Sequence, residues 1–419
     1  MFPVEREAGC RRVRDTSDLP LRRTLYRIGR EFVQQGGVLS GVRLLLLTVG
    51  CAALICAGTG CRHPPVRVTV LPAVRSSPPA TNVVREPTLN PPKSSSMPAA
   101  APPKRSVPYW VPPTNLTYEG WVEIRTWAKD LGIAPPVSAM VGTNFVETLL
   151  FPTGRLAIRL GRQQAQWQGN EFWLALAPQL VRGRGCVHAL DIQATLMPLL
   201  TDDGDLPCTN SVVVLDPGHG GQNPGAPSVA SSRWEKEYTL DWALRLKPLL
   251  ERTGWQVCLT RTNDTDVTLS DRVALADAQQ AGLFLSLHFN HAPGRPDESG
   301  IETYCVTPAG LPSTVVRGER EDLAAVWSNN AFDTGNLRMA FRLHRAVVGR
   351  TGAVDRGVRR ARFMGVLRTQ ERVAVLIEGG YLSNVREARL IASAAYRQAL
   401  AEAVAEGLGA PPQSAQPAP

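Results

Sequence analysis

The sequence lacks the cysteine spacing of a thiolate metal site. Four of its eight cysteines lie beyond residue 180, and no two of them form a C-x-x-C pair: Cys186, Cys208, Cys258 and Cys305. Because cysteine-held zinc usually relies on such pairs, we expect no metal bound by thiolates. Cys258 and Cys305 lie in strand-like runs and are expected to be buried small side chains. The sequence does not decide whether Cys186 and Cys208 form a disulfide.

The sequence also lacks a nucleic-acid-binding pattern, in which basic and aromatic residues interleave. The formal net charge is +9, and part of this excess lies in the N-terminal segments rather than in the C-terminal half. A basic protein can bind nucleic acid, a membrane or an acidic polymer. Without a nucleic-acid motif, we expect no nucleic-acid partner and favour the polyanionic surface of a cell envelope.

A chain of 419 residues is too long for one compact domain, so several modules are expected. Residues 1–61 form a leader, in which an arginine-rich stretch precedes the uncharged apolar run Leu44–Gly60. This order of charge and hydrophobicity is typical of an export signal. Cys61 follows small residues at the end of the run, which resembles a bacterial lipoprotein signal and makes Cys61 a candidate for lipidation. An ordinary signal peptide and an uncleaved membrane anchor are the alternatives.

Two segments have the composition of a spacer or a tail. Residues 62–116 are rich in proline, serine and alanine and contain too few apolar residues to form a core. Such a segment acts as an extended, semi-rigid linker. Residues 412–419 are expected to be a disordered tail.

Residues 117–205 are expected to form a small α+β domain. Apolar residues from Trp121 to Leu131 recur at helical spacing, short strand-like runs follow, and a helix ending near Leu200 closes the segment. The turn Gln166–Gly169 and its flanking strands resemble the small domain found beside copper amine oxidases and in many bacterial envelope proteins. This resemblance implies a role in binding or positioning, not copper chemistry.

Residues 208–411 alternate strand and helix patterns, with a last helix expected near residues 386–407. Three apolar runs end in His or Glu: Val212–Leu215 leads to His219, Leu283–Leu287 to His288, and Val373–Ile377 to Glu378. Such runs are typical of an open, mostly parallel α/β sheet with helices on both faces. Since parallel strands bring their carboxyl ends to one edge, these side chains should meet there. The sequence therefore predicts a metal site and a hydrolase.

Several blocks in this half resemble, in order, the zinc-dependent N-acetylmuramoyl-L-alanine amidases (amidase_3 type). They are Val213–Gly221 with Pro224–Ala226, Glu235–Glu237, Ser286–Asn290, Gly300–Tyr304, Asp355–Val358 and Leu376–Asn384. The resemblance covers about half of the chain. It implies Zn²⁺ as cofactor. Together with the leader and Cys61, it predicts an exported, periplasmic, membrane-anchored enzyme of the cell envelope.

The resemblance also implies roles for individual residues. His219, Glu235 and His288 match the zinc ligands, with Glu237 as the alternative to Glu235. Glu378 matches the catalytic glutamate, and Asn290 is a candidate for substrate binding. The residues themselves favour the same chemistry, because catalytic zinc often has two His and one Glu ligand and leaves a position for water. A carboxylate beside that water can move its proton.

The expected reaction is cleavage of the amide between N-acetylmuramic acid and L-alanine in peptidoglycan. One alternative is another zinc peptidase that acts on the stem peptides. Another is a non-catalytic peptidoglycan-binding lipoprotein, which is disfavoured because no candidate ligand is missing. The long segment Thr307–Thr334 is a candidate lid, since some members of the family carry an inhibitory helix there that an activator protein displaces.

Overall fold

The computed structural model describes residues 117–118, 120–318 and 320–412. The predicted leader with Cys61, the linker 62–116 and nearly all of the tail 412–419 therefore lie outside the described residues. Within the described ranges, no helix has both the length and the apolar character that crossing a membrane requires.

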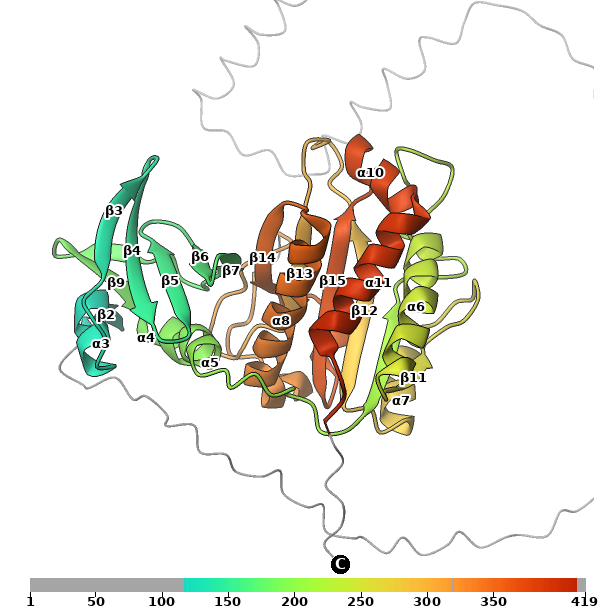
Figure 1. Cartoon of the computed structure of the whole chain (residues 1–419), viewed down its shortest axis with the longest axis horizontal. Helices are drawn as coiled ribbons and strands as arrows, with labels where there is room; N and C mark the ends of the chain where they lie inside the picture. Colours follow the sequence, from blue (N-terminus) through green and yellow to red (C-terminus); the bar gives the residue numbers. More distant parts are fainter. Residues whose placement is uncertain (1–116, 119, 319, 413–419) are drawn as a thin grey trace, which may run out of the picture. The chain divides into compact units, whose positions relative to one another are not determined.

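The C-terminal half is built on a mostly parallel sheet (Figure 1). Its strand order is β11-β10-β12-β15-β13-β14. Strands β11, β10, β12 and β15 run parallel, β13 is antiparallel to β15, and β14 is parallel to β13. The strands are β10 (Val212–Pro217), β11 (Gln256–Leu259), β12 (Leu283–Asn290), β13 (Ile301–Cys305), β14 (Asp355–Arg360) and β15 (Val373–Tyr381).

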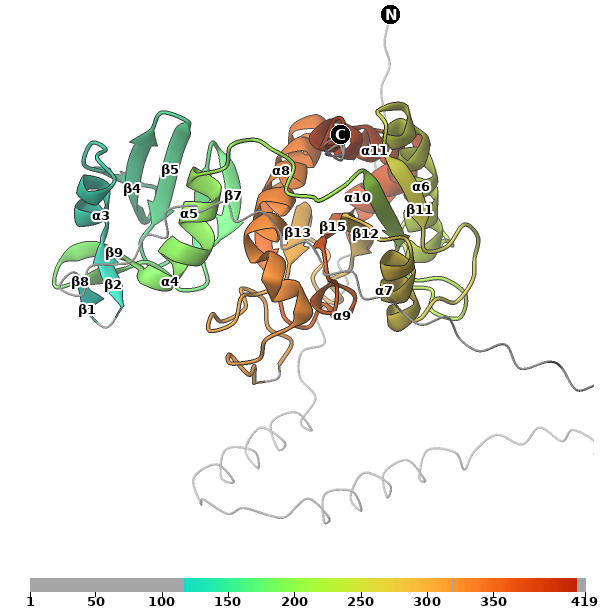
Figure 2. The same cartoon turned by 90° about the horizontal axis from the view of Figure 1, so that it is seen from below.

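Helices cover both faces of this sheet (Figure 2). Alternate strand residues point to opposite faces. Val213 and Leu215 belong to one core cluster with the buried residues of α6 (Glu235–Arg252), α8 (Asp333–Thr351) and α11 (Ala394–Leu408). Val214 belongs to the opposite cluster with α7 (Leu269–Ala278) and α9 (Gly365–Arg368). The predicted α/β architecture of this half is thereby confirmed.

The N-terminal half is a strand-rich segment with antiparallel pairing. Strands β3 to β7 pair in sequence order, and a second sheet has the order β1-β2-β9-β8. Strand bounds are β1 (Thr117–Tyr118), β2 (Trp121–Glu123), β3 (Val137–Val141), β4 (Asn144–Phe151), β5 (Gly154–Arg159), β6 (Gln164–Trp167), β7 (Asn170–Trp173), β8 (Gln179–Val181) and β9 (Arg184–His188). The helices are α3 (Ile124–Asp130), α4 (Ala189–Asp191), a π-helical turn at Ile192–Leu196, and α5 (Met197–Leu200).

The two halves share one continuous sheet of 11 strands, because β7 pairs in parallel with β14. Around this junction the amide of Glu171 donates to Asp355 Oδ2 (2.9 Å), and Trp173 Nε1 donates to the carbonyl of Arg356 (2.9 Å). The guanidinium of Arg359 lies 4.2 Å from the centroid of the Trp173 ring, within the range of a cation–π contact. The small half is thus joined to the edge of the α/β sheet by main-chain and side-chain contacts.

Several details differ from the sequence-based expectation. The last helix is two helices, α10 (Val385–Ala392) and α11, which Ser393 separates in an extended conformation. Cys186 and Cys208 are free, so the disulfide left open above is not formed in this structure. Cys305 is buried as expected, whereas Cys258 is only partly buried.

Candidate metal centre

The three predicted ligands converge from three different elements. His219 follows the end of β10, His288 lies near the end of β12, and Glu235 is the first residue of α6. Their ligand atoms all lie within 4.8 Å of one another. Glu235 Oε2 is 3.1 Å from His219 Nε2, and Glu235 Oε1 is 2.9 Å from His288 Nδ1. The structure therefore brings together the two imidazoles and one carboxylate that the sequence singled out.

Glu235 is the most enclosed of the three. Its Oε1 also accepts a hydrogen bond from the amide of Phe289 (3.0 Å), and its Oε2 accepts one from the amide of Ala226 (3.0 Å). Burial acts against its ionisation, but the hydrogen bonds from His219 and His288 outweigh burial and lower the pKa of Glu235 below its usual value. The carboxylate is thereby held in the charged form that a metal ligand requires.

Two glycines make this close approach possible. A Cβ added at Gly218 would lie 2.2 Å from the ring of His288, and one added at Gly225 would lie 2.7 Å from both Glu235 Oε2 and the ring of His219. His219 itself has a φ of 63°, an uncommon conformation for a residue with a side chain. Any larger residue at these glycines would displace a candidate ligand.

Hydrogen bonds from buried polar side chains fix the turn that carries His219. Asp216 accepts hydrogen bonds from Thr260 and Ser286 (2.7 Å each) and is paired with Arg272. The other end of the Arg272 guanidinium donates to the carbonyl of His219 (2.8 Å), and Arg261 donates to the carbonyl of Gly218 (2.8 Å). Asp216 thus acts on the backbone of the turn through Arg272, which it holds in place.

Glu378 lies beside the histidines on the neighbouring strand. It is the register partner of His288 across β12 and β15, and of Glu302 across β13 and β15. Its Oε2 is buried and has no hydrogen-bond partner among the described residues. Burial, followed by the charges of Glu235 and Glu302, raises the pKa of Glu378 well above its usual value. A carboxyl group with a raised pKa next to a metal-ligand cluster suits proton transfer near neutral pH.

Glu302 is a residue that the sequence reasoning did not select. It is buried, forms ion pairs with Arg356 (2.7 Å) and Arg359 (3.2 Å), and accepts a hydrogen bond from Tyr304 (2.7 Å). A glutamate in the otherwise apolar or neutral strand Ile301–Cys305 was the signal that could have found it. Its charge adds to the negative environment of Glu378.

Two further predicted site residues, Asn290 and Glu237, are not part of the candidate ligand cluster. Asn290 donates to Glu302 Oε2 (2.8 Å), while its own Oδ1 accepts from the amide of His291 (2.9 Å). Both ends of its amide are therefore engaged within the protein. Glu237 accepts a hydrogen bond from the amide of Trp234 (3.2 Å) at the start of α6 and pairs with Arg233, away from the two histidines.

The donor set fits a zinc ion. Two imidazoles and one carboxylate are the ligands of many catalytic zinc sites, and those sites keep a fourth position open. His219 is fixed by a contact between its Nδ1 and Asn223 Oδ1 (3.0 Å), the kind of outer contact that orients a metal-binding imidazole. With zinc bound by these three residues, the buried Oε2 of Glu378, which has no partner among the described residues, would be available as a hydrogen-bond acceptor.

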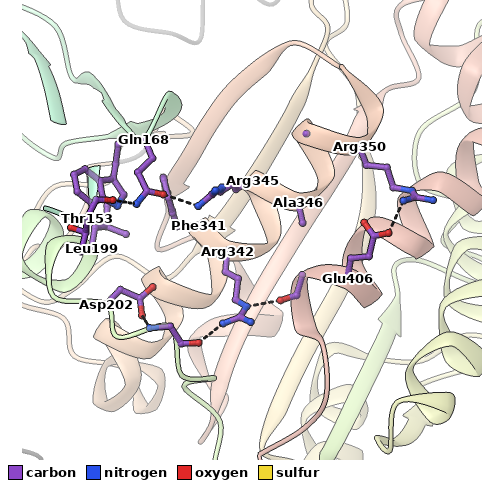
Figure 3. Close-up of a pocket in the computed structure, with 14 residues that line it drawn as sticks. Thr153, Gln168, Leu199, Asp202, Phe341, Arg342, Arg345, Ala346, Arg350 and Glu406 are labelled. Atoms are coloured by element: carbon purple, nitrogen blue, oxygen red, sulfur yellow. Dashed lines mark hydrogen bonds and ion pairs between the residues drawn. The ribbon is translucent and has the colours of Figure 1, made fainter. Parts of the chain in front are cut away.

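A cavity of about 380 Å³ adjoins the cluster. His219 and His288 line it together with Asp266, Thr268 and Val366. A larger cavity of about 650 Å³ lies elsewhere, where Thr153 of the β4–β5 turn, the end of β6 and Leu199 of α5 face helices α8 and α11 (Figure 3). Its arginines are engaged within the protein: Arg342 with Gly204 and Gly407, Arg345 with Gln168, and Arg350 with Glu402 and Glu406. Of these two cavities, the smaller is the one lined by two of the candidate ligands, His219 and His288.

Comparison with known proteins agrees with this geometry. A family profile described as N-acetylmuramoyl-L-alanine amidase (Amidase_3) matches residues 213–410. The chain is 32% identical over 218 residues to the N-acetylmuramoyl-L-alanine amidase AmiA of Escherichia coli K12, a match that covers 47% of this chain and 74% of AmiA. It is 31% identical over 282 residues to AmiC of Escherichia coli O6:H1, covering 56% of this chain and 67% of AmiC. The chain belongs to the N-acetylmuramoyl-L-alanine amidase family, which confirms the resemblance in its sequence.

Two further similarities complete the comparison. The probable cell wall amidase LytH of Staphylococcus epidermidis is 33% identical over 203 residues, and the match spans 48% of this chain and 58% of LytH. The catalytic domain of CwlV from Bacillus (Paenibacillus) polymyxa var. colistinus is 30% identical, with a TM-score of 0.40 over 47% of this chain and 96% of that domain. The chain thus spans between about half and three quarters of the length of these three full-length relatives.

Proposed function

We propose that this protein is a zinc-dependent hydrolase that cleaves the amide between N-acetylmuramic acid and L-alanine in peptidoglycan. The observation that carries the proposal is the grouping of His219, Glu235 and His288 within 4.8 Å, with Glu378 as register partner of His288. The choice of bond, the amide to L-alanine, and of substrate polymer, peptidoglycan, rests on membership of the family.

Each residue has a separate role in the proposed reaction. His219, Glu235 and His288 hold the metal, which when bound supplies a water of lowered pKa and polarises the carbonyl. Glu378 takes the proton of the attacking water at its carboxylate and returns it to the nitrogen of L-alanine. The C–N bond breaks as the new C–O bond forms, leaving a lactyl carboxylate and a free amine.

We further propose a cell-envelope location. The relatives named as cell wall amidases support this part, and so do the export-like leader and Cys61 as a lipidation site in the sequence. In this proposal the small half binds or positions the wall polymer, as its sequence resemblance implies.

The test is digestion of purified peptidoglycan by the full chain, with products identified by mass. We expect free stem peptides that begin with L-alanine, and we expect their loss with a chelator and recovery with added Zn²⁺. Shortened peptides still attached to the glycan would instead identify a stem-peptide peptidase. Binding to the wall without any released product would identify a non-catalytic lipoprotein.

A further inference from the structure

The larger cavity, of about 650 Å³, is formed by both halves of the chain (Figure 3). The small half contributes Trp167, Gln168 and Leu199, while residues of helices α8 and α11 form the other side. None of the candidate metal ligands lines this cavity. Its volume is within the range of small-ligand sites, which combine apolar walls with a few placed polar groups. The cavity is therefore a separate place where a ligand would contact both halves.

Two arginines of α8 line the cavity with uncharged partners. Arg342 donates to the carbonyls of Gly204 (2.7 Å) and Gly407. Arg345 donates to Gln168 Oε1 (2.6 Å). In the described part of the chain, neither of these two residues, the arginine pair, forms an ion pair. Since a guanidinium has five N–H groups, each keeps donors beyond these contacts. The contacts hold both groups in place and leave both charges without a counter-charge.

The acidic side chains of the cavity are engaged by other arginines. Glu406 pairs with Arg350 (2.7 Å), which also pairs with Glu402. Asp202 lies 3.9 Å from the Nε of Arg338. The negative charges that line the cavity thus have cationic neighbours of their own, and the arginine pair supplies an excess of positive charge.

The spacing of the arginine pair suits a single anion. Arg342 and Arg345 are three residues apart on α8, so their Cβ atoms lie about 5–6 Å apart on the same side of the helix. Two positive charges this close repel each other, and a shared anion offsets the repulsion. A phosphate monoester carries about two negative charges near neutral pH and has three free acceptor oxygens, whereas a carboxylate has one charge and two oxygens. Because each guanidinium can form two parallel hydrogen bonds, the pair matches a phosphate better.

We propose that this cavity is a phosphate-binding site, in which Arg342 and Arg345 bind the phosphate oxygens. The site lies apart from the metal cluster and does not depend on the proposed function. Inorganic phosphate and a phosphate carried by a larger molecule share this chemistry. Since both halves line the cavity, a bound phosphate stabilises the contact between them.

The experiment measures binding of inorganic phosphate to the full chain by isothermal titration calorimetry, at constant ionic strength because salt screens such contacts. We expect one saturable site. Arg345→Ala should weaken binding about 10- to 100-fold, as expected for loss of hydrogen bonds to a charged group. Arg345 is exposed, so its removal should leave the fold intact. Arg342→Ala should weaken binding in the same way.

The matched control is Arg389→Ala, which removes an exposed arginine of α10 and should leave binding unchanged. Phosphate should also raise the thermal unfolding temperature of the wild-type protein but not that of Arg345→Ala, because a ligand of the folded state stabilises it. Glycerol 3-phosphate distinguishes the two sources. Tighter binding than inorganic phosphate supports a site for a phosphate carried by a larger molecule, and weaker binding supports a site for the free anion.

Three results would overturn the phosphate site: no saturable binding, equally tight binding of acetate, or binding that neither Arg345→Ala nor Arg342→Ala changes. Phosphate that binds only with zinc present, and is lost with a chelator, belongs to the metal cluster and would also overturn it. Because no hydrolysis is measured, none of these results bears on the proposed function.

Discussion

The two halves of the 11-stranded sheet bury their strands in different ways. Of the nine residues of β15, eight are buried, and five consecutive residues of β12 are buried, because helices cover both faces. In β4 and β6, buried residues are interspersed with partly exposed ones, as in an antiparallel sheet with one covered face. In the fully covered half, a polar residue at the end of a strand is exceptional and marks the site. In the other half polar residues are routine, so their positions carry no such information.

The largest effect should come from the polar residue at the end of β15. Glu378→Gln keeps the shape of the side chain but cannot accept and return a proton, so we expect amide hydrolysis to fall by about 10²- to 10⁴-fold. Peptidoglycan digestion followed by mass analysis measures this loss, and thermal unfolding checks that the fold is intact. Near-normal activity would remove Glu378 from the proposed proton transfer.

Alanine substitutions of neighbouring core residues should separate the two burial patterns. In β12, Phe284 and Leu285 are both fully buried on opposite faces, so each change to alanine should cost about 2–5 kcal/mol. In β4, Leu149 is fully buried whereas Leu150 is 58% exposed. We expect a similar cost for Leu149→Ala and at most about 0.5 kcal/mol for Leu150→Ala. Chemical denaturation measures all four, and a large cost at Leu150 would contradict the one-sided burial of β4.

The junction between the halves should contribute less. Trp173→Phe removes the hydrogen bond to the carbonyl of Arg356 and weakens the contact with Arg359, so we expect a loss of about 0.5–1.5 kcal/mol. Since the sheet is continuous, we also expect the described region to unfold in a single transition. Two transitions in calorimetry of the wild-type protein would show that the halves are energetically independent.

The smallest expected effect is on the stability of the protein at acid pH, through an ion pair between α6 and α11. Burial opposes the ionisation of Asp241 in α6, but hydrogen bonds from Arg245 and from Arg397 in α11 lower its pKa. A carboxylate with a lowered folded-state pKa stabilises the protein above its unfolded pKa, near 4, and this contribution is lost as the pH falls through the folded value. Asp241→Asn should therefore flatten the stability curve below about pH 4. An unchanged acid limb would mean that other carboxylates determine it.

The predictable part of the fold was the part governed by local patterns. The runs that end at His219, His288 and Glu378 indicated buried parallel strands, and the structure has β10, β12 and β15 there. The sequence does not predict a strand at β14, because Asp355, Arg356, Arg359 and Arg360 give it the composition of a loop. Its charges find partners far away in sequence, such as Glu302 and Thr195, and its pairing with β7 depends on tertiary contacts.

Parts of the candidate site also depend on tertiary contacts that the sequence does not reveal. Glu235 and Glu237 both lie in the first turn of α6, and sequence alone does not decide which one faces the histidines. Two residues along a helix differ by about 200° in direction, so only the packing of α6 against β12 makes the choice. Glu302 was missed for a related reason, since its role depends on the register of β13 against β15.

The pairing of β7 with β14 also decides where the sheet ends. Without β7, β14 would be an exposed edge beside the strand that carries Glu302. With it, the free edge moves to β3, whose five residues are all exposed and uncharged. An uncharged exposed edge is the place where another strand can add to a sheet. Four strands, β4 to β7, therefore separate this open edge from β14 and from the part of the sheet that carries the candidate metal ligands.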